Sequence, residues 1–202
     1  MESPHDPARL PSDLPRPAPD GEADHLPGSA MPSVALPSTN GGLVSVDLVP
    51  QGFERLVIYA FPLIGLPGVD PPPGWDEIPG ARGCTPESCG FRDHAAELAA
   101  EGTAVVGLSI QSTDYQREAT QRLRLPFPLL SDVDLRLTHE LKLPTFIVQL
   151  RPQHDGGGRR TLLKRLTLVV RDRCIEKVFY PVFPPDGHAE AVLMWVRGRM
   201  SS

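Results

Sequence analysis

The stretch GARGCTPESCGFRD, residues 80–93, places two cysteines five positions apart at the start of a predicted helix. Thr85 suits the N-cap of that helix, Pro86 suits its first position, and Glu87 in the first turn suits the helix dipole. Upstream, RLVIYAF (55–61) is a continuous apolar run typical of a buried strand. The Pro/Gly-rich segment 62–83 joins the two and is longer than an ordinary loop. Cys84 is therefore expected where a strand leads into a helix N-terminus.

The rest of the chain predicts the elements around this junction. The predicted strands are 41–49, 103–110, 127–132 and 174–180, with a hairpin of 145–150 and 161–170 around RPQHDGGGRR. One predicted helix ends at Gly102, one follows a cap at Ser112 or Thr113, and one covers 134–143. A last helix turns Ala189, Val192, Leu193 and Val196 inward. This order predicts an α/β protein with a mixed central sheet and helices on both faces, as in thioredoxin-like folds.

The composition of the chain indicates its cellular compartment and excludes some classes of binding partner. The chain has 202 residues and a net charge of −5, which gives no basic footprint for nucleic acid or anionic membranes. Three cysteines, an odd count, fit a reducing compartment better than a disulfide scaffold. No apolar run approaches the roughly 18 residues of a membrane span. The start MESPHDPARL does not resemble a signal peptide. A cytoplasmic protein is expected.

The N-terminal part differs in composition from the rest. The first 37 residues hold nine of the 24 prolines and few aromatic or β-branched residues. Such a segment buries too little apolar surface to offset its ordering entropy. We therefore expect residues 1–30 to form a mobile extension or a surface strap, and residues 31–202 to form one domain.

Three interpretations of the cysteine pair compete. Cys84 and Cys89 are the nucleophile and the resolving thiol of a peroxidase, or ligands of a metal-binding module that includes His94, or small buried side chains. The metal interpretation lacks a fourth ligand near by in the sequence. Burial alone explains Cys84 poorly, because Gly, Thr and Pro surround it. A helix N-terminus and a nearby arginine would both favour its thiolate. Cys174 follows a turn and has no such context, so we expect it to be inert.

Four motifs in one order resemble a known family. They are GSAMPSVAL (28–36), RGCTPESCGFRD (82–93), KRLTLVV (164–170) and IEKVF (175–179). With these motifs the chain resembles the peroxiredoxins of the Q type, the bacterioferritin-comigratory-protein group. The resemblance covers residues 28 to 196.

The resemblance implies an activity and a role for each site residue. Cys84 would be the peroxidatic cysteine, Cys89 the resolving cysteine, and Arg165 the cation that steadies the thiolate and the peroxide. Thr85 and Gly83, beside Cys84, would contact the substrate. The protein would reduce hydrogen peroxide or organic hydroperoxides through a Cys84–Cys89 intrachain disulfide, which thioredoxin or a similar dithiol would reduce.

The same resemblance implies no metal, haem or flavin. An intrachain disulfide removes the need for a second subunit, so we expect a monomer. The alternative function is a non-catalytic redox sensor that uses the same disulfide.

The chain departs from the family pattern at one place. The family carries a proline seven residues before the peroxidatic cysteine and a peroxide-binding threonine three residues before it. Here these positions are Glu77 and Ala81, and Pro79 is displaced by two. We expect the 62–83 loop or Thr85 to supply the missing hydrogen-bond donor.

The spacing of the two cysteines also has a consequence. In one regular helix, five residues separate the Cα atoms by roughly 9 Å, whereas a disulfide spans at most about 7 Å. Disulfide formation is therefore expected to unwind residues 82–93.

Overall fold

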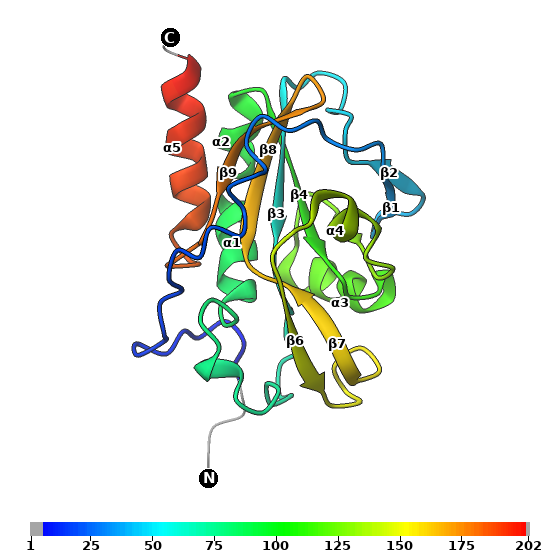
Figure 1. Cartoon of the computed structure of the whole chain (residues 1–202), viewed down its shortest axis with the longest axis vertical. Coiled ribbons are helices and arrows are strands. Elements are labelled where there is room, and N and C mark those ends of the chain that lie inside the picture. Colours follow the sequence, from blue (N-terminus) through cyan, green and yellow to red (C-terminus); the bar gives the residue numbers. More distant parts are fainter. Residues whose placement is uncertain (1–5, 201–202) are drawn as a thin grey trace.

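The computed structural model describes residues 6–200, and its centre is a five-stranded sheet in the order β5–β4–β3–β8–β9 (Figure 1). The strands are β3 (Arg55–Ala60), β4 (Thr103–Ser109), β5 (Leu129–Ser131), β8 (Leu166–Arg171) and β9 (Cys174–Phe179). Strands β3, β4 and β5 run parallel to one another, whereas β8 and β9 pair antiparallel. The prediction of a mixed sheet is confirmed.

Two small antiparallel sheets lie outside this centre. One joins β1 (Ala35–Pro37) to β2 (Leu43–Ser45), and the other joins β6 (Thr145–Leu150) to β7 (Gly158–Leu163). The single strand predicted at 161–170 was wrong, because β7 and β8 belong to different sheets. Lys164 and Arg165 lie between β7 and β8 and belong to neither strand. Their side chains form ion pairs with Asp20 and Glu87, respectively.

The helices are α1 (Cys84–Asp93), α2 (Ala95–Ala100), α3 (Thr113–Leu123), α4 (Arg136–Leu141), α5 (His188–Met200) and the short 3-10 helix η1 (Trp75–Glu77). The single helix predicted up to Gly102 is two helices, α1 and α2, separated by His94 at φ −97° and ψ 4°. The predicted cap of α3 is confirmed, since the hydroxyl of Ser112 accepts the backbone N–H of Tyr115 at 3.3 Å.

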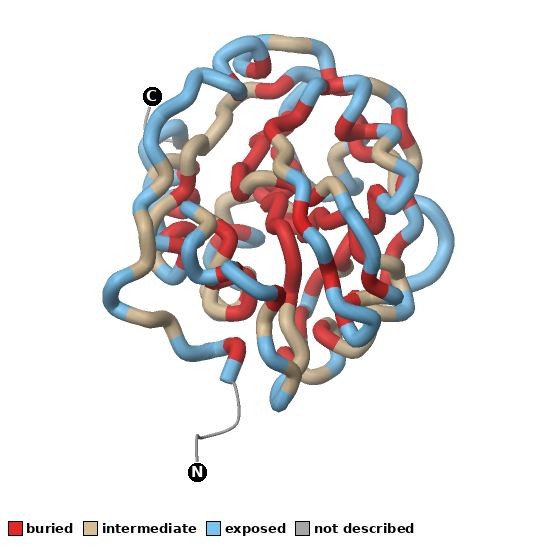
Figure 2. The backbone as a smooth tube through the Cα atoms, turned by 60° about the horizontal axis from the view of Figure 1, so that its bottom comes forward, coloured by how far each residue is buried: buried red, intermediate tan, exposed pale blue. Residues whose placement is uncertain are grey.

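Alternate side chains of β3 supply two apolar cores, one on each face of the sheet. Val57, Tyr59 and Phe61 pack on one face with residues of α1, α2, α3 and α5. Leu56 and Ile58 pack on the other face with residues of α4, β1 and the β6–β7 hairpin. Figure 2 shows these buried central strands in red. Helices thus cover both faces, as predicted. The four apolar residues predicted to face inward on the last helix are all buried.

Most of residues 6–30 are exposed or half-buried and contact several elements, whereas Ala23 and Leu26 are buried in the apolar core. Asp20 accepts hydrogen bonds from Lys164 Nζ and from the Tyr180 hydroxyl, both at 2.8 Å. Further on, His25 Nε2 lies 2.8 Å from the Leu141 carbonyl. The assignment of residues 1–30 as a mobile extension stays a prediction, and residues 1–5 lie outside the described range.

Within residues 6–200, no helix combines the length and the apolar character needed to cross a membrane.

Candidate active site

Cys84 is the first residue of α1, and Gly83 is its N-cap. The predicted cap at Thr85 was wrong, and no side-chain hydrogen bond caps this helix. Gly83 has φ 107°, a left-handed conformation that L side chains rarely adopt. A Cβ at this position would also collide with the ring of Pro185. Glycine is therefore needed to place the Cys84 thiol at the helix entrance.

The thiol of Cys84 lies among hydrogen-bonding groups from distant parts of the chain. Arg165 Nη2 donates to Cys84 Sγ at 3.2 Å, and the backbone N–H of Leu63 also donates to this sulfur. In the thiol form, Cys84 Sγ–H donates a hydrogen bond to the Ala81 carbonyl at 3.7 Å. The structure thus brings together Cys84 and Arg165, which are 81 residues apart in the sequence.

Arg165 is fully enclosed and also orders the loop before Cys84. Its Nη1 forms an ion pair with the carboxylate of Glu87, and the two side chains are 1% and 0% exposed. Its Nε donates to the Gly80 carbonyl at 3.3 Å, and its Nη2 donates to the carbonyls of Ala81 and Arg82, both at 3.2 Å. One guanidinium therefore holds the thiol, a carboxylate and three consecutive backbone carbonyls.

The charged groups around Cys84 have opposite effects on the pKa of its thiol. Burial raises the pKa of Cys84, the Arg165 guanidinium lowers it, and the Glu87 carboxylate raises it further. The expected lowering by an arginine is present, but burial outweighs it. Burial also raises the pKa of Glu87 to about 7 despite the adjacent guanidinium. Because Glu87 and Cys84 share one cation, protonation of Glu87 near neutral pH leaves Arg165 to favour the Cys84 thiolate.

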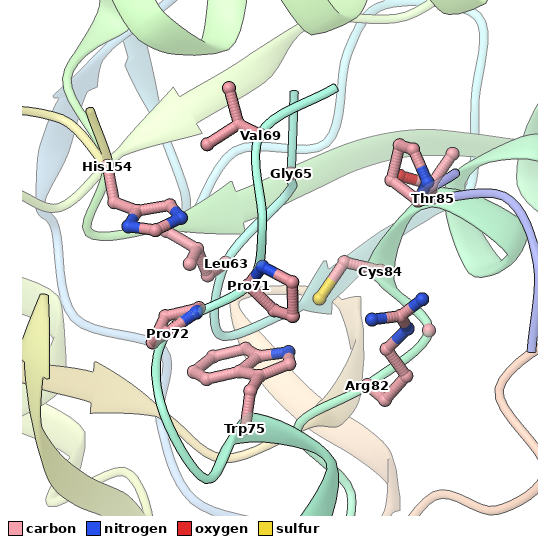
Figure 3. A pocket seen from close by; sticks show the side chains of 12 residues that line it. Leu63, Gly65, Val69, Pro71, Pro72, Trp75, Arg82, Cys84, Thr85 and His154 are labelled. Carbon is pink, nitrogen blue, oxygen red and sulfur yellow. The ribbon is translucent and has the colours of Figure 1, made fainter. Parts of the chain in front are cut away.

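Cys84 opens onto a cavity of about 30 Å³ (Figure 3). Gly83 and Thr85 line it beside the cysteine. Its apolar walls are Pro7, Leu63, Val69, Pro71, Pro72 and Trp75. Figure 3 shows the Trp75 ring and the Cys84 sulfur facing the same space. The long 62–83 segment therefore forms most of the enclosure around the thiol.

Three buried polar atoms belong to residues that line the cavity and have no hydrogen-bond partner among the described residues. They are Arg82 Nε, Thr85 Oγ1 and His154 Nδ1. His154 lies in the turn between β6 and β7, and its Nε2 is 2.9 Å from the Asp70 carbonyl. Ala81 stands where the family threonine is expected, and only its backbone carbonyl contacts the site.

Glu87 and His154 are the site residues that sequence reasoning missed. In the sequence, Glu87 is marked only by a position in the first helical turn that suits the helix dipole. Its position one turn after Cys84 was a usable signal, because a residue three positions on lies on the same side of a helix. The sequence carried no comparable signal for His154, which is 70 residues beyond Cys84 and reaches the cavity only through the β6–β7 hairpin.

Cys89 lies on the same helix as Cys84 but in different surroundings. It is half-buried, packs on the apolar cluster that contains Tyr59, and is hydrogen-bonded by the Arg92 side chain. All three cysteines are free thiols, and Cys174 is exposed on β9. Because α1 is regular from Cys84 to Asp93, a bond between the two cysteines requires this helix to unwind.

The residues weighed as metal ligands do not form a cluster. Among residues 6–200, no group of three or more His, Cys, Asp or Glu side chains is arranged to hold a metal ion. His94 Nδ1 instead lies 2.9 Å from a carboxylate oxygen of Glu97. The metal-binding alternative thus has no ligand set in this part of the chain.

Replacing Arg165 by methionine should raise the pKa of Cys84, because the neighbouring positive charge stabilises the thiolate. The measurement is the rate of Cys84 alkylation against pH, followed by peptide mapping. Arg160→Met is the control, since Arg160 lies in β7 and its Nε contacts the Gly157 carbonyl. Overlapping pH profiles for wild type and Arg165→Met would contradict this role.

Replacing Glu87 by glutamine should have the opposite effect. The negative Glu87 carboxylate disfavours a second negative charge at Cys84, so its removal should lower the pKa of the thiol. The same alkylation profile should move to lower pH. Glu97→Gln, at an exposed position on α2, should leave the profile unchanged. An unchanged or higher pKa in Glu87→Gln would show that Glu87 acts only by positioning Arg165.

Similarity to known proteins agrees with this geometry. The family model described as Redoxin matches residues 26–193. A putative peroxiredoxin bcp of Coxiella burnetii is 26% identical over 166 residues, covering 82% of this chain and 95% of that protein. Peroxiredoxin Bcp of Escherichia coli is 26% identical over 170 residues, covering 84% and 94%. The crystal structure of peroxidoxin BcpB from Mycobacterium tuberculosis superposes with a TM-score of 0.63 at 24% identity, covering 86% and 97%. The chain therefore belongs to the redoxin family, as a thiol-dependent peroxidase of the Bcp, or Q, type of peroxiredoxin.

Proposed function

We propose that Cys84 is the peroxidatic cysteine of this peroxiredoxin and Cys89 its resolving cysteine. The observation that carries this assignment is the 3.2 Å hydrogen bond from a buried arginine to Cys84 Sγ at the entrance of α1. An anion at this sulfur faces a guanidinium, a backbone N–H and the positive end of a helix. Cys174, which is exposed on β9, lies outside this arrangement.

In the first step, the Cys84 thiolate attacks the terminal oxygen of a hydroperoxide. The S–O bond forms, the O–O bond breaks, and the leaving oxygen takes a proton from solvent water to become water or an alcohol. Negative charge moves from sulfur to the leaving oxygen during this step. Arg165 can stabilise both ends of that charge movement, because its hydrogen bonds to the backbone keep the guanidinium in place.

In the second step, the Cys89 thiol attacks the Cys84 sulfenic acid, forms the disulfide and releases water. The regular helix α1 must unwind first. Gly90 makes this easier, since glycine weakens a helix by roughly 1 kcal/mol relative to alanine. A thiol reductant then returns both cysteines to the thiol state by transferring two electrons. A dithiol of the thioredoxin type fits this exchange, and the intrachain disulfide lets a monomer complete the cycle.

Cysteine variants test these assignments. Cys84→Ser should reduce peroxide turnover with a recycling dithiol to background. Cys89→Ser should consume one peroxide and then stop, with the intact mass increased by one oxygen atom. Cys174→Ser should behave like wild type. Normal cycling by Cys84→Ser would refute the assignment, and only stoichiometric oxidation of the wild type would favour a redox sensor over an enzyme.

Thr85 is our candidate for the donor that Ala81 does not provide. Its hydroxyl is buried, has no partner among the described residues, and belongs to a residue that lines the cavity. Loss of one hydrogen bond to peroxide should slow Cys84 oxidation by about tenfold in Thr85→Val. Thr85→Ser keeps the hydroxyl and should stay near the wild-type rate. Equal rates in Thr85→Val and Thr85→Ser would exclude this role.

A further inference from the structure

A turn near the N-terminus inserts one side chain into the cavity of Cys84. The backbone N–H of Arg9 donates to the Asp6 carbonyl at 3.2 Å, and the N–H of Ala8 donates to Asp6 Oδ1 at 2.9 Å. Asp6, Ala8 and Arg9 are exposed, whereas Pro7 between them is buried and lines the cavity. We call residues 6–10 the plug.

Arg82 holds the plug against the site. Its Nη2 donates to the carbonyls of Arg9 and Asp6 at 3.2 and 3.5 Å, and its Nη1 pairs with Asp76 at 3.3 Å. These contacts join the plug to the 62–83 segment, two residues before the reactive cysteine.

Two glycines receive the plug. Pro7 Cβ lies 3.5 Å from the point where a Cβ of Gly65 would be, and Leu10 Cδ2 lies 3.2 Å from the equivalent point at Gly83. Pro7 and Leu10 of the plug therefore pack against Gly65 and Gly83, which have no side chains to obstruct them. Two apolar contacts and the hydrogen bonds of Arg82 therefore join the plug to the cavity.

With Pro7 in place, the cavity has about 30 Å³. A site for one water needs roughly 10–15 Å³, so this volume suits about two oxygen-sized atoms. Hydrogen peroxide has that size. The organic group of cumene hydroperoxide is larger than this volume, and Pro7 is one of the apolar walls that it would meet, together with Pro71, Pro72 and Trp75.

We propose that Pro7 is a specificity-determining residue, through which the plug restricts the site to small peroxides. This inference rests on the proposed role of Cys84. Removal of the Pro7 ring enlarges the space in front of the thiol and leaves Arg165, Thr85 and Cys84 unchanged. The effect should therefore depend on the size of the reagent and not on the intrinsic reactivity of the thiol.

The test compares Pro7→Gly with the matched control Ala8→Gly, which alters an exposed residue of the same turn. Second-order rates of Cys84 oxidation are measured with hydrogen peroxide and with cumene hydroperoxide. Pro7→Gly should accelerate the reaction with cumene hydroperoxide by roughly tenfold or more, the discrimination that small apolar groups provide in a pocket. Its rate with hydrogen peroxide should change less than about twofold. Ala8→Gly should match the wild type with both peroxides.

A second measurement separates the plug from the chemistry of the peroxidase. Alkylation of Cys84 by iodoacetamide, which is small, and by N-phenylmaleimide, which is bulky, is scored by peptide mapping. Pro7→Gly should accelerate only the bulky reagent. Equal acceleration of small and bulky reagents, or no acceleration, would overturn the proposal. If neither peroxide oxidises Cys84 while the alkylation contrast persists, the proposed function fails and the steric role of Pro7 stands.

Discussion

The buried guanidinium of Arg165 is the charge on which the geometry of the site depends. A buried charge costs several kcal/mol unless it is paired and hydrogen-bonded. Arg165 meets this requirement with the Glu87 carboxylate, three backbone carbonyls and the Cys84 sulfur. The loop before α1, the first turn of α1 and the β7–β8 junction thus meet at one side chain. Arg165 can reach all of these groups because it lies between β7 and β8, which belong to different sheets.

The same arrangement shares one positive charge between two acids. Glu87 and Cys84 both have raised pKa values from burial, and Arg165 opposes the rise at each. Ionisation of one acid makes ionisation of the other less favourable. Burial and the Glu87 carboxylate thus oppose the stabilisation that Arg165 gives to the Cys84 thiolate. A negative Glu87 carboxylate raises the pKa of Cys84, so protonation of Glu87 favours the thiolate.

Glu87 also links the chemistry to the change in conformation. It lies between Cys84 and Cys89 in α1, so a disulfide that unwinds this helix also moves the carboxylate relative to Arg165. Gly90 lies close to α5, where an added Cβ would be 3.4 Å from Ala189 Cβ. Unwinding must therefore release contacts with α5 as well as the Glu87–Arg165 ion pair. The proposed Cys84–Cys89 disulfide would therefore replace the enclosed thiol and the regular helix α1 by an unwound form of the same segment.

Local patterns in the sequence determined much of the fold. Apolar runs located the central strands, period-3.6 spacing identified the buried face of α5, and Ser112 was recognised as a cap. The family motifs singled out Cys84 and Arg165. What the sequence did not reveal depends on contacts between distant residues. The split of 161–170 into β7 and β8, the helix cap at Gly83, and the convergence of Pro7 and His154 on Cys84 are of this kind. Only the tertiary structure decided them, because apolar periodicity and local propensity record which residues are buried in an element, but not which partner from another part of the chain they meet.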